Sequence, residues 1–193
     1  MGIATNRKIN HKINYDDIRL IQPNMHYMDS YRAAVKEYYA RQVEDFAYPK
    51  VSTKRRAAAY LRRLENFRRG IDVPKGYVPC SSFWLVDGQH YLGSGDVRHY
   101  LNDRLRRLGG NIGYSVNPLF WRRGLGTLQL ALLLKEAKKL HITKPIVTCF
   151  DANTPSAKII EKNGGVLVDV MTNPFRGEHR LTRIYEIDLT QQF

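Results

Sequence analysis

The segment that decides the fold joins a β-prone stretch to the most apolar helix-forming stretch of the chain. At residues 117–127 it reads Asn117-Pro118-Leu119-Phe120-Trp121-Arg122-Arg123-Gly124-Leu125-Gly126-Thr127. Gly124 and Gly126 have no side chains, so a ligand can approach the backbone closely, and the first N–H groups of the following helix point outward at the positive end of its dipole. Arg122 and Arg123 add positive charge beside those groups. The segment predicts a phosphate-binding loop. In the alternative interpretation, the two glycines serve only the backbone conformation of the turn.

The hydrophobic periodicity on either side of this loop alternates between strand and helix. Period-two stretches predict strands at residues 17–22, 82–86, 90–97, 111–116, 145–150, 166–171 and 183–189. Helical spacing and capping signals predict helices at residues 28–41, 54–69 and 124–141 and a fourth after residue 153. Asp87-Gly88 predicts a type I′ hairpin turn, and loops are expected at residues 71–82 and 173–179. This order predicts one mixed α/β domain at residues 16–193 behind a loose basic tail at residues 1–15.

The composition is that of a folded domain with a strong positive charge. The chain has 193 residues, of which 43% are hydrophobic, and a formal net charge of +13. A field of that sign favours anionic partners, and nucleic acid, an acidic protein, a membrane surface and a phosphate-bearing cofactor all fit it. Residues 54–69 carry seven basic residues against Glu65 alone. An ordinary amphipathic helix with a solvated basic side and a contact surface for a polyanion both fit that run.

Cysteine and histidine usage narrows the class further. The two cysteines, Cys80 and Cys149, lie far apart in sequence, which argues against a disulfide framework and favours a reducing cytoplasm. The six histidines show no spacing typical of metal ligands, so no metal is expected. The most apolar stretch, residues 125–134, is well short of the roughly 20 residues that a bilayer span requires. We therefore expect a cytoplasmic protein without a membrane helix or a metal.

The chain contains two motifs that resemble those of a known family and follow each other in the same order. Val116-Asn117-Pro118 followed by residues 121–126 resembles the acetyl-CoA pyrophosphate loop of the GNAT superfamily of N-acetyltransferases, with Trp121 at the position where the family has Gln or Arg. Residues 153–165 resemble the second cofactor motif of the family, in which an Asn opens a helix that ends in glycine before a strand. With residues 109–116 these motifs lie within residues 109–165. The nearest likeness is to a poorly characterised bacterial branch of the superfamily.

The resemblance implies a fold and a cofactor site. The fold is the GNAT-like acyl-CoA N-acyltransferase fold, an α+β arrangement whose central, mostly antiparallel sheet has two splayed strands and flanking helices. Acetyl-CoA, the cosubstrate, lies between the splayed strands. The residues implied to bind it are Ser115 and Val116 through their backbone, the loop residues Arg122, Arg123, Gly124, Leu125, Gly126 and Thr127, and the helix residues Asn153 and Ser156. A helix N-cap role for Asn153 and a packing role for Ser156 fit the same residues.

The implied activity is direct transfer of the acetyl group to a primary amine of an unidentified small molecule or peptide. Such an amine must lose a proton, and the weak candidates for acid–base catalysis are Tyr114, Tyr185, His99, Asp96 and Asp151. Many family members carry a tyrosine acid seven residues after the motif Asn, and this chain has Ile160 there. Cys149, on an apolar strand, is expected to be a small buried hydrophobe and not an acyl carrier.

Two other classes of function stay open at this point. One is a basic nucleic-acid-binding module, although the sequence shows no recognition motif for nucleic acid, and the other is a regulator that binds acetyl-CoA without turnover. The strand-rich C-terminal part is also compatible with a homodimer.

Overall fold

The computed structural model describes residues 12–43 and 49–190. Five α-helices and seven strands alternate along this part of the chain, with three short 3₁₀ helices. The helices are α1 (Met28–Ala40), α2 (Lys54–Arg68), α3 (Asp103–Arg107), α4 (Leu125–Lys139), α5 (Thr154–Lys162), η1 (Tyr15–Asp17), η2 (Met25–Tyr27) and η3 (Pro118–Phe120). The strands are β1 (Arg19–Ile21), β2 (Cys80–Val86), β3 (Tyr91–Arg98), β4 (Ile112–Val116), β5 (Ile146–Phe150), β6 (Gly165–Phe175) and β7 (Glu178–Ile187).

The seven strands form one sheet in the order β1-β2-β3-β4-β5-β7-β6. Every neighbouring pair is antiparallel except β4 and β5, which are parallel and share a single registered pair, Ile112 opposite Val147. Beyond that pair the two strands separate. The expected mostly antiparallel sheet with two splayed strands is therefore confirmed.

Asn111 holds the closed end of the splay. Its backbone N–H donates to the Ile146 carbonyl oxygen at 2.7 Å, and its side-chain oxygen accepts from the Ile146 N–H at 2.9 Å. Its side-chain nitrogen reaches the Arg98 carbonyl at 3.3 Å, which ties β3 to the same point. The preceding Gly110 has a φ of 61°, and a Cβ there would lie 2.3 Å from the Ile146 oxygen. The chain can approach β5 this closely only with glycine at residue 110.

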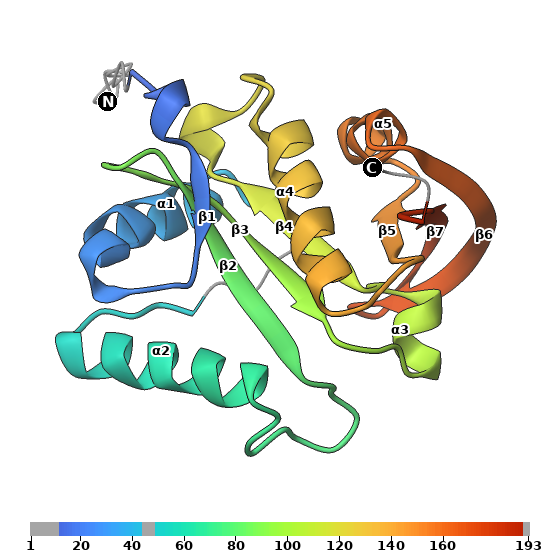
Figure 1. The fold of residues 1–193 in the computed structure, drawn as a ribbon, viewed down its shortest axis with the longest axis horizontal. Coiled ribbons are helices and arrows are strands. Elements are labelled where there is room, and N and C mark those ends of the chain that lie inside the picture. The colour runs from blue at the N-terminus through green and yellow to red at the C-terminus, as the bar shows by residue number, and fades with distance from the viewer. Residues whose placement is uncertain (1–11, 44–48, 191–193) are drawn as a thin grey trace.

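Helices cover both faces of the sheet. On one face, α1 and α2 pack on an aromatic cluster in which Tyr31 stacks on Trp84 with ring centroids 4.9 Å apart. On the other face, α4 lies across β3 and β4 next to α5 (Figure 1). There Leu133 sits directly over Gly95, where a Cβ would come within 2.4 Å of the leucine side chain. The sheet is thus the middle layer of three.

The structure corrects several details of the sequence-based expectations. The Asp87 hairpin is not type I′, because only Gly88 has a positive φ, and the Asp87 side chain accepts from the backbone N–H groups of Gln89 and His90. Residues 173–179, expected to form a loop, belong mostly to the two strands. β6 continues to Phe175 and β7 begins at Glu178, so that only Arg176 and Gly177 form the turn. The short helix α3, capped by the Asn102 side chain, was not expected.

The N-terminal boundary differs in part from the expected tail. Residues 1–11 lie outside the described residues. Ile13, however, is buried in a core cluster with Leu85 and Leu92, and Tyr15 begins a 3₁₀ helix. The folded part of the chain therefore already includes Ile13. Within the described ranges, no helix has the length and apolar character needed to cross a membrane.

Replacement of Asn111 by alanine tests the closed end of the splay. Asn111→Ala leaves the buried Ile146 N–H and the Arg98 carbonyl without their side-chain partners, so we expect the free energy of unfolding to fall by about 2–4 kcal/mol. Urea unfolding of Asn111→Ala measures the loss, with Gln89→Ala, at an exposed position, as the control. Equal stability of the two variants would contradict a structural role for the Asn111 side chain.

Candidate active site

A cavity of about 770 Å³ joins the opening between β4 and β5 to the face of the sheet that α2 covers. Residues of β4, β5 and the start of α5 line one part of it, among them Tyr114, Cys149, Asn153 and Ser156. Residues of α2, β2 and β3 line the other part, among them Tyr60, Ser82, Trp84 and Asp96. The two halves of the cavity are contributed by segments that are far apart in the sequence.

The loop between β4 and α4 is built to present backbone N–H groups. Asn117 is buried, donates through its side chain to the Tyr91 carbonyl at 2.9 Å and accepts from the Leu119 N–H at 3.1 Å. Arg122 and Gly124 both have positive φ, of 63° and 77°, so the chain turns sharply into the helix. Gly124 is the N-cap and makes no side-chain cap. The first amides of α4 therefore keep their donors for an anionic ligand.

Trp121 occupies the position where the resemblance suggested a Gln or Arg contact. Its indole Nε1–H donates to the Val116 carbonyl at 2.7 Å, and the Arg41 guanidinium lies 5.7 Å from the ring centroid. The indole thus ties the loop to the end of β4. In this chain that side chain stabilises the loop.

Gly126 has a different reason to be glycine from the one that the sequence suggested. A Cβ at Gly126 would lie 2.6 Å from the Cδ1 atom of Ile159 on α5 and 3.7 Å from Val116. The missing side chain therefore lets α4 pack closely on α5. Gly124, by contrast, has no heavy atom within 4 Å of an added Cβ, so its side faces open space. The close approach of a ligand fits Gly124, and Gly126 serves helix packing.

Backbone alternation decides which groups of β4 face the opening. The Asn111 carbonyl accepts from Arg98 and the Asn117 N–H donates to Leu92, so both residues bond toward β3. The β3–β4 register runs between them without a bulge. Because neighbouring residues of a strand alternate, the backbone of Ser115 also faces β3, and the N–H of Val116 faces β5. Of the two residues implied to bind the pantetheine arm through backbone groups, Val116 is therefore the one oriented for it.

The start of α5 and the side chain of Tyr114 meet across the opening. Asn153 is the N-cap of α5, and its side-chain oxygen accepts from the Ser156 N–H at 3.1 Å. The Tyr114 hydroxyl lies 3.0 Å from the Ser156 Oγ. Burial raises the pKa of Tyr114 above its usual value, so its hydroxyl stays protonated at neutral pH. This part of the cavity holds a hydroxyl pair that can donate hydrogen bonds.

Three of the residues considered for catalysis do not line the cavity. Tyr185 is buried and its hydroxyl donates to Glu161 at 3.1 Å. His99 lies 2.9 Å from the Ser81 Oγ, and burial, assisted by Arg68, lowers the pKa of its imidazole. Asp151 forms an ion pair with Arg183 at 2.7 Å. Tyr114 and Asp96 are the candidates that remain in the cavity.

Asp96 faces the half of the cavity under α2. Its carboxylate accepts a hydrogen bond from the Ser82 Oγ at 2.6 Å. Ser82 and Asp96 lie directly opposite each other on β2 and β3. Burial is the largest cause that raises the pKa of the nearby Tyr60 to about 12, and the Asp96 charge raises it further. Among the residues that line this cavity, Asp96 is the only carboxylate. It is therefore the group available there to take a proton.

The sequence patterns do not identify Tyr60 and Ser82 as residues of this half of the cavity. Ser82 and Asp96 do carry a signal, because both are polar residues in a hairpin that is otherwise largely apolar. Tyr60 carries no such signal, since an aromatic residue on the apolar face of a helix is ordinary core.

Ile160, at the position where many family members carry a tyrosine acid, is completely buried in the main core cluster. No cluster of three or more possible metal-ligating side chains occurs within residues 12–43 and 49–190.

The fold and the cavity define a class of enzyme, the acyltransferases that take an acyl-CoA between two splayed strands. The chain belongs to the GNAT acetyltransferase domain family: the family model described as acetyltransferase (GNAT) domain matches residues 20–166. It is therefore an acyltransferase with acetyl-CoA as its cosubstrate, which confirms the family, the enzyme class and the cosubstrate expected from the sequence. The primary-amine acceptor, the cytoplasmic location and the homodimer stay predictions.

Solved structures of several acetyltransferases are similar to this fold. The microcin C7 self-immunity acetyltransferase MccE, in complex with acetyl-CoA and AMP, aligns with a TM-score of 0.67 and 14% identity over 90% of this chain and 93% of its own. RimL, the ribosomal L7/L12 alpha-N-protein acetyltransferase, in complex with coenzyme A, has the same TM-score and the same identity over 91% of this chain and 97% of its own. A GNAT-family acetyltransferase from Bacillus anthracis aligns with a TM-score of 0.63 and 19% identity over 93% of this chain and 99% of its own. No curated protein sequence matches the chain significantly.

The Cys149 thiol provides a probe of the opening between the strands. The side chain is 8% exposed, and burial is the main cause that raises its pKa to about 11. We expect iodoacetamide to modify Cys149 slowly at pH 8, with a rate that increases about tenfold for each pH unit while the thiolate fraction grows. Mass spectrometry of the labelled peptide measures the rate, and the urea-unfolded chain is the control. Rapid labelling of the folded protein at pH 7 would contradict this environment.

Proposed function

We propose that the chain transfers the acetyl group of acetyl-CoA directly to a primary amine. The observation that carries the proposal is the continuity of the cavity, which connects the opening between β4 and β5 to the carboxylate of Asp96. An acetyl donor in the opening and an amine next to Asp96 would share one cavity. Direct transfer requires both reactants at once, and holding them together removes most of the entropic cost of their encounter.

The cofactor is proposed to bind along the route that the resemblance implied. Its pyrophosphate would lie on the amides of Gly124, Leu125, Gly126 and Thr127, with Arg122 and Arg123 adding charge. The Val116 N–H would face the thioester end of the pantetheine arm, and Asn153 lines the cavity beside it. The complexes of MccE with acetyl-CoA and of RimL with coenzyme A support binding of the same cofactor on this fold.

The chemistry assigns one step to each polar group of the cavity. A proton leaves the bound ammonium for the Asp96 carboxylate, and the neutral amine then forms a bond to the thioester carbon while the C–S bond breaks. The Val116 N–H stabilises the negative charge that develops on the carbonyl oxygen. The sulfur leaves as a thiolate, which the Tyr114 hydroxyl supports by a hydrogen bond. The new amide nitrogen still carries one proton in excess, and this proton passes through water to the thiolate, because a thiol has a pKa of about 8.5 and the raised pKa of Tyr114 keeps the tyrosine proton in place.

Acetyl-CoA should stabilise the folded chain through the loop. At about 100 times its Kd, it is expected to add about 2.7 kcal/mol to the free energy of unfolding. Arg122→Glu reverses an exposed charge at the loop without touching the core, and we expect it to weaken binding about tenfold. Thermal melting with and without acetyl-CoA measures both effects, and Lys135→Glu, at an exposed position in the C-terminal half of α4, is the charge-matched control. An unchanged shift in Arg122→Glu would exclude the loop as the pyrophosphate site.

Catalysis should depend on Asp96 and Tyr114. Asp96→Asn removes the base and is expected to lower kcat/KM by about a hundredfold. Tyr114→Phe removes one hydrogen bond to the leaving sulfur, which corresponds to a roughly ten- to hundredfold loss in kcat. Release of CoA with a panel of amines gives both values.

The matched controls for these two variants are Asp151→Asn and Tyr185→Phe, whose side chains lie outside the cavity. Both controls should retain turnover, and all four variants should keep the acetyl-CoA-dependent thermal shift. Turnover by Asp96→Asn at the parent rate would exclude Asp96 as the base. The absence of CoA release with every amine, in a protein that still binds acetyl-CoA, would favour a regulator without turnover.

A further inference from the structure

We infer that the acceptor is the α-amino group of a polypeptide whose next residues are acidic. This inference rests on the proposed function and specifies the substrate class of the same site. It follows from three features of the cavity, which are its charge, its continuation over the surface and the kind of base that it contains.

Exposed arginines mark the mouth of the cavity, whereas its one carboxylate, Asp96, is half-buried. Arg63 of α2, Arg98 of β3, Arg104 of α3 and Arg176 of the β6–β7 turn all line it, and they come from four separate segments. Within the described residues, none of the four has a carboxylate within 4 Å. Arg63, Arg104 and Arg176 are exposed, whereas Arg98 is half-buried and donates to the carbonyl oxygens of Gly109 and Gly110 at 2.8 and 3.1 Å. A ligand that matches this arrangement carries a positive end inside and negative groups at the mouth.

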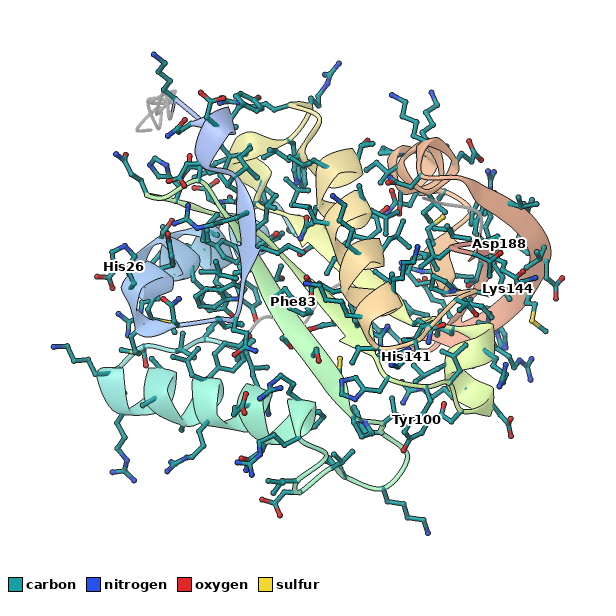
Figure 2. All side chains as sticks on the ribbon, viewed as in Figure 1. His26, Phe83, Tyr100, His141, Lys144 and Asp188 are labelled. Carbon is teal, nitrogen blue, oxygen red and sulfur yellow. The ribbon has the colours of Figure 1, made fainter. Side chains whose placement is uncertain are left out.

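The segments that form the mouth are held together by hydrogen bonds. The Asn102 side chain before α3 donates to the Gly76 carbonyl at 3.1 Å, and the Asn173 side chain donates to the Arg107 carbonyl at 3.0 Å. Figure 1 shows α3 at the same end of the molecule as the loop after α2, and Tyr100, labelled in Figure 2, marks the connection from β3 to α3. The segments that carry Arg104 and Arg176 are therefore joined to each other, and together with Arg63 these arginines form the rim of the cavity.

A second hollow continues the path beyond the rim. It has a volume of about 540 Å³ and shares Arg63, Phe67 and Tyr77 with the main cavity. The rings of Phe67 and Tyr77 meet edge to face with centroids 6.4 Å apart, and the hollow is lined by Arg62 and Arg63 against one carboxylate, Asp72. Two hollows that share a wall fit an elongated ligand better than a compact one. A polypeptide that enters with its N-terminus first has this shape.

The available base favours an α-amine over a lysine side chain. The residues that line the main cavity include one carboxylate, Asp96, and no histidine. At pH 7 an α-amino group with a pKa of about 7.7–8.0 is neutral in roughly one molecule in seven, whereas a lysine amine with a pKa of about 10.4 is neutral in fewer than one in a thousand. A weak base suffices for the first acceptor and is poorly matched to the second. A polyamine would in addition be repelled by the arginines of the rim.

Acetylation of a set of short peptides tests the inference. The set has a peptide with a free α-amine followed by acidic residues, a peptide with basic residues instead, and an N-formylated acidic peptide with one lysine. A small polyamine completes it. With acetyl-CoA and the full chain, mass spectrometry should show kcat/KM for the acidic α-amine peptide at least about tenfold above the others. Equal or better acetylation of any other acceptor overturns this inference and leaves the proposed acetyl transfer standing. Failure of every acceptor overturns both.

Charge reversal at the rim provides the matched test. Arg63→Glu and Arg104→Glu should each raise KM for the acidic peptide about tenfold and reduce its advantage over the basic peptide. Arg55→Glu on α2 and Arg106→Glu on α3 are the controls, because neither arginine lines a hollow. A loss of folding would lower turnover of both peptides equally and would not change their ratio. If the ratio is the same in Arg63→Glu and Arg55→Glu, the rim does not select the acceptor.

Discussion

The separation of β4 from β5 is the constraint on which the rest of the structure depends. A parallel strand pair normally continues its hydrogen bonds along its length, and here it stops after one registered pair. Asn111 holds the two strands at the closed end with two hydrogen bonds to Ile146 and is tied to β3 by a third, and Gly110 permits the close approach. The backbone groups of β4 beyond that point face an opening instead of a neighbouring strand. An extended cofactor can bind there as a strand would.

The two faces of the sheet contribute different chemistry to one cavity. The face under α4 and α5 supplies the Tyr114 and Ser156 hydroxyls, and the face under α2 supplies Asp96 and Ser82. These groups can cooperate only because the sheet is open between its two central strands. The proposed reaction uses this separation, since the proton acceptor and the hydrogen-bond donor for the leaving sulfur must act on opposite sides of the thioester.

Local patterns and packing give different explanations for the same residues. Gly126 resembles a ligand-binding glycine by its spacing, yet the space beside it is filled by Ile159. Ser115 and Val116 are equivalent by position in the motif, and only the ladder with β3 shows which of them faces the opening. Tyr185 and Asp151 lie on or next to the expected strands, but Glu161 and Arg183 bind their polar groups outside the cavity. In each case the deciding neighbour is distant in sequence.

The sequence by itself determined the order of most strands and helices, the loop that leads into α4 and the family, because these depend on periodicity, capping and contiguous motifs. It also indicated the positive charge that an anionic cofactor requires. The tertiary structure alone decided that Tyr60, Ser82, Asp96 and Tyr114 line one cavity and that arginines of four segments surround its mouth. Such a site depends on side chains that meet across strands and helices, and the distance between them is set by sheet order and packing, which a linear pattern does not contain.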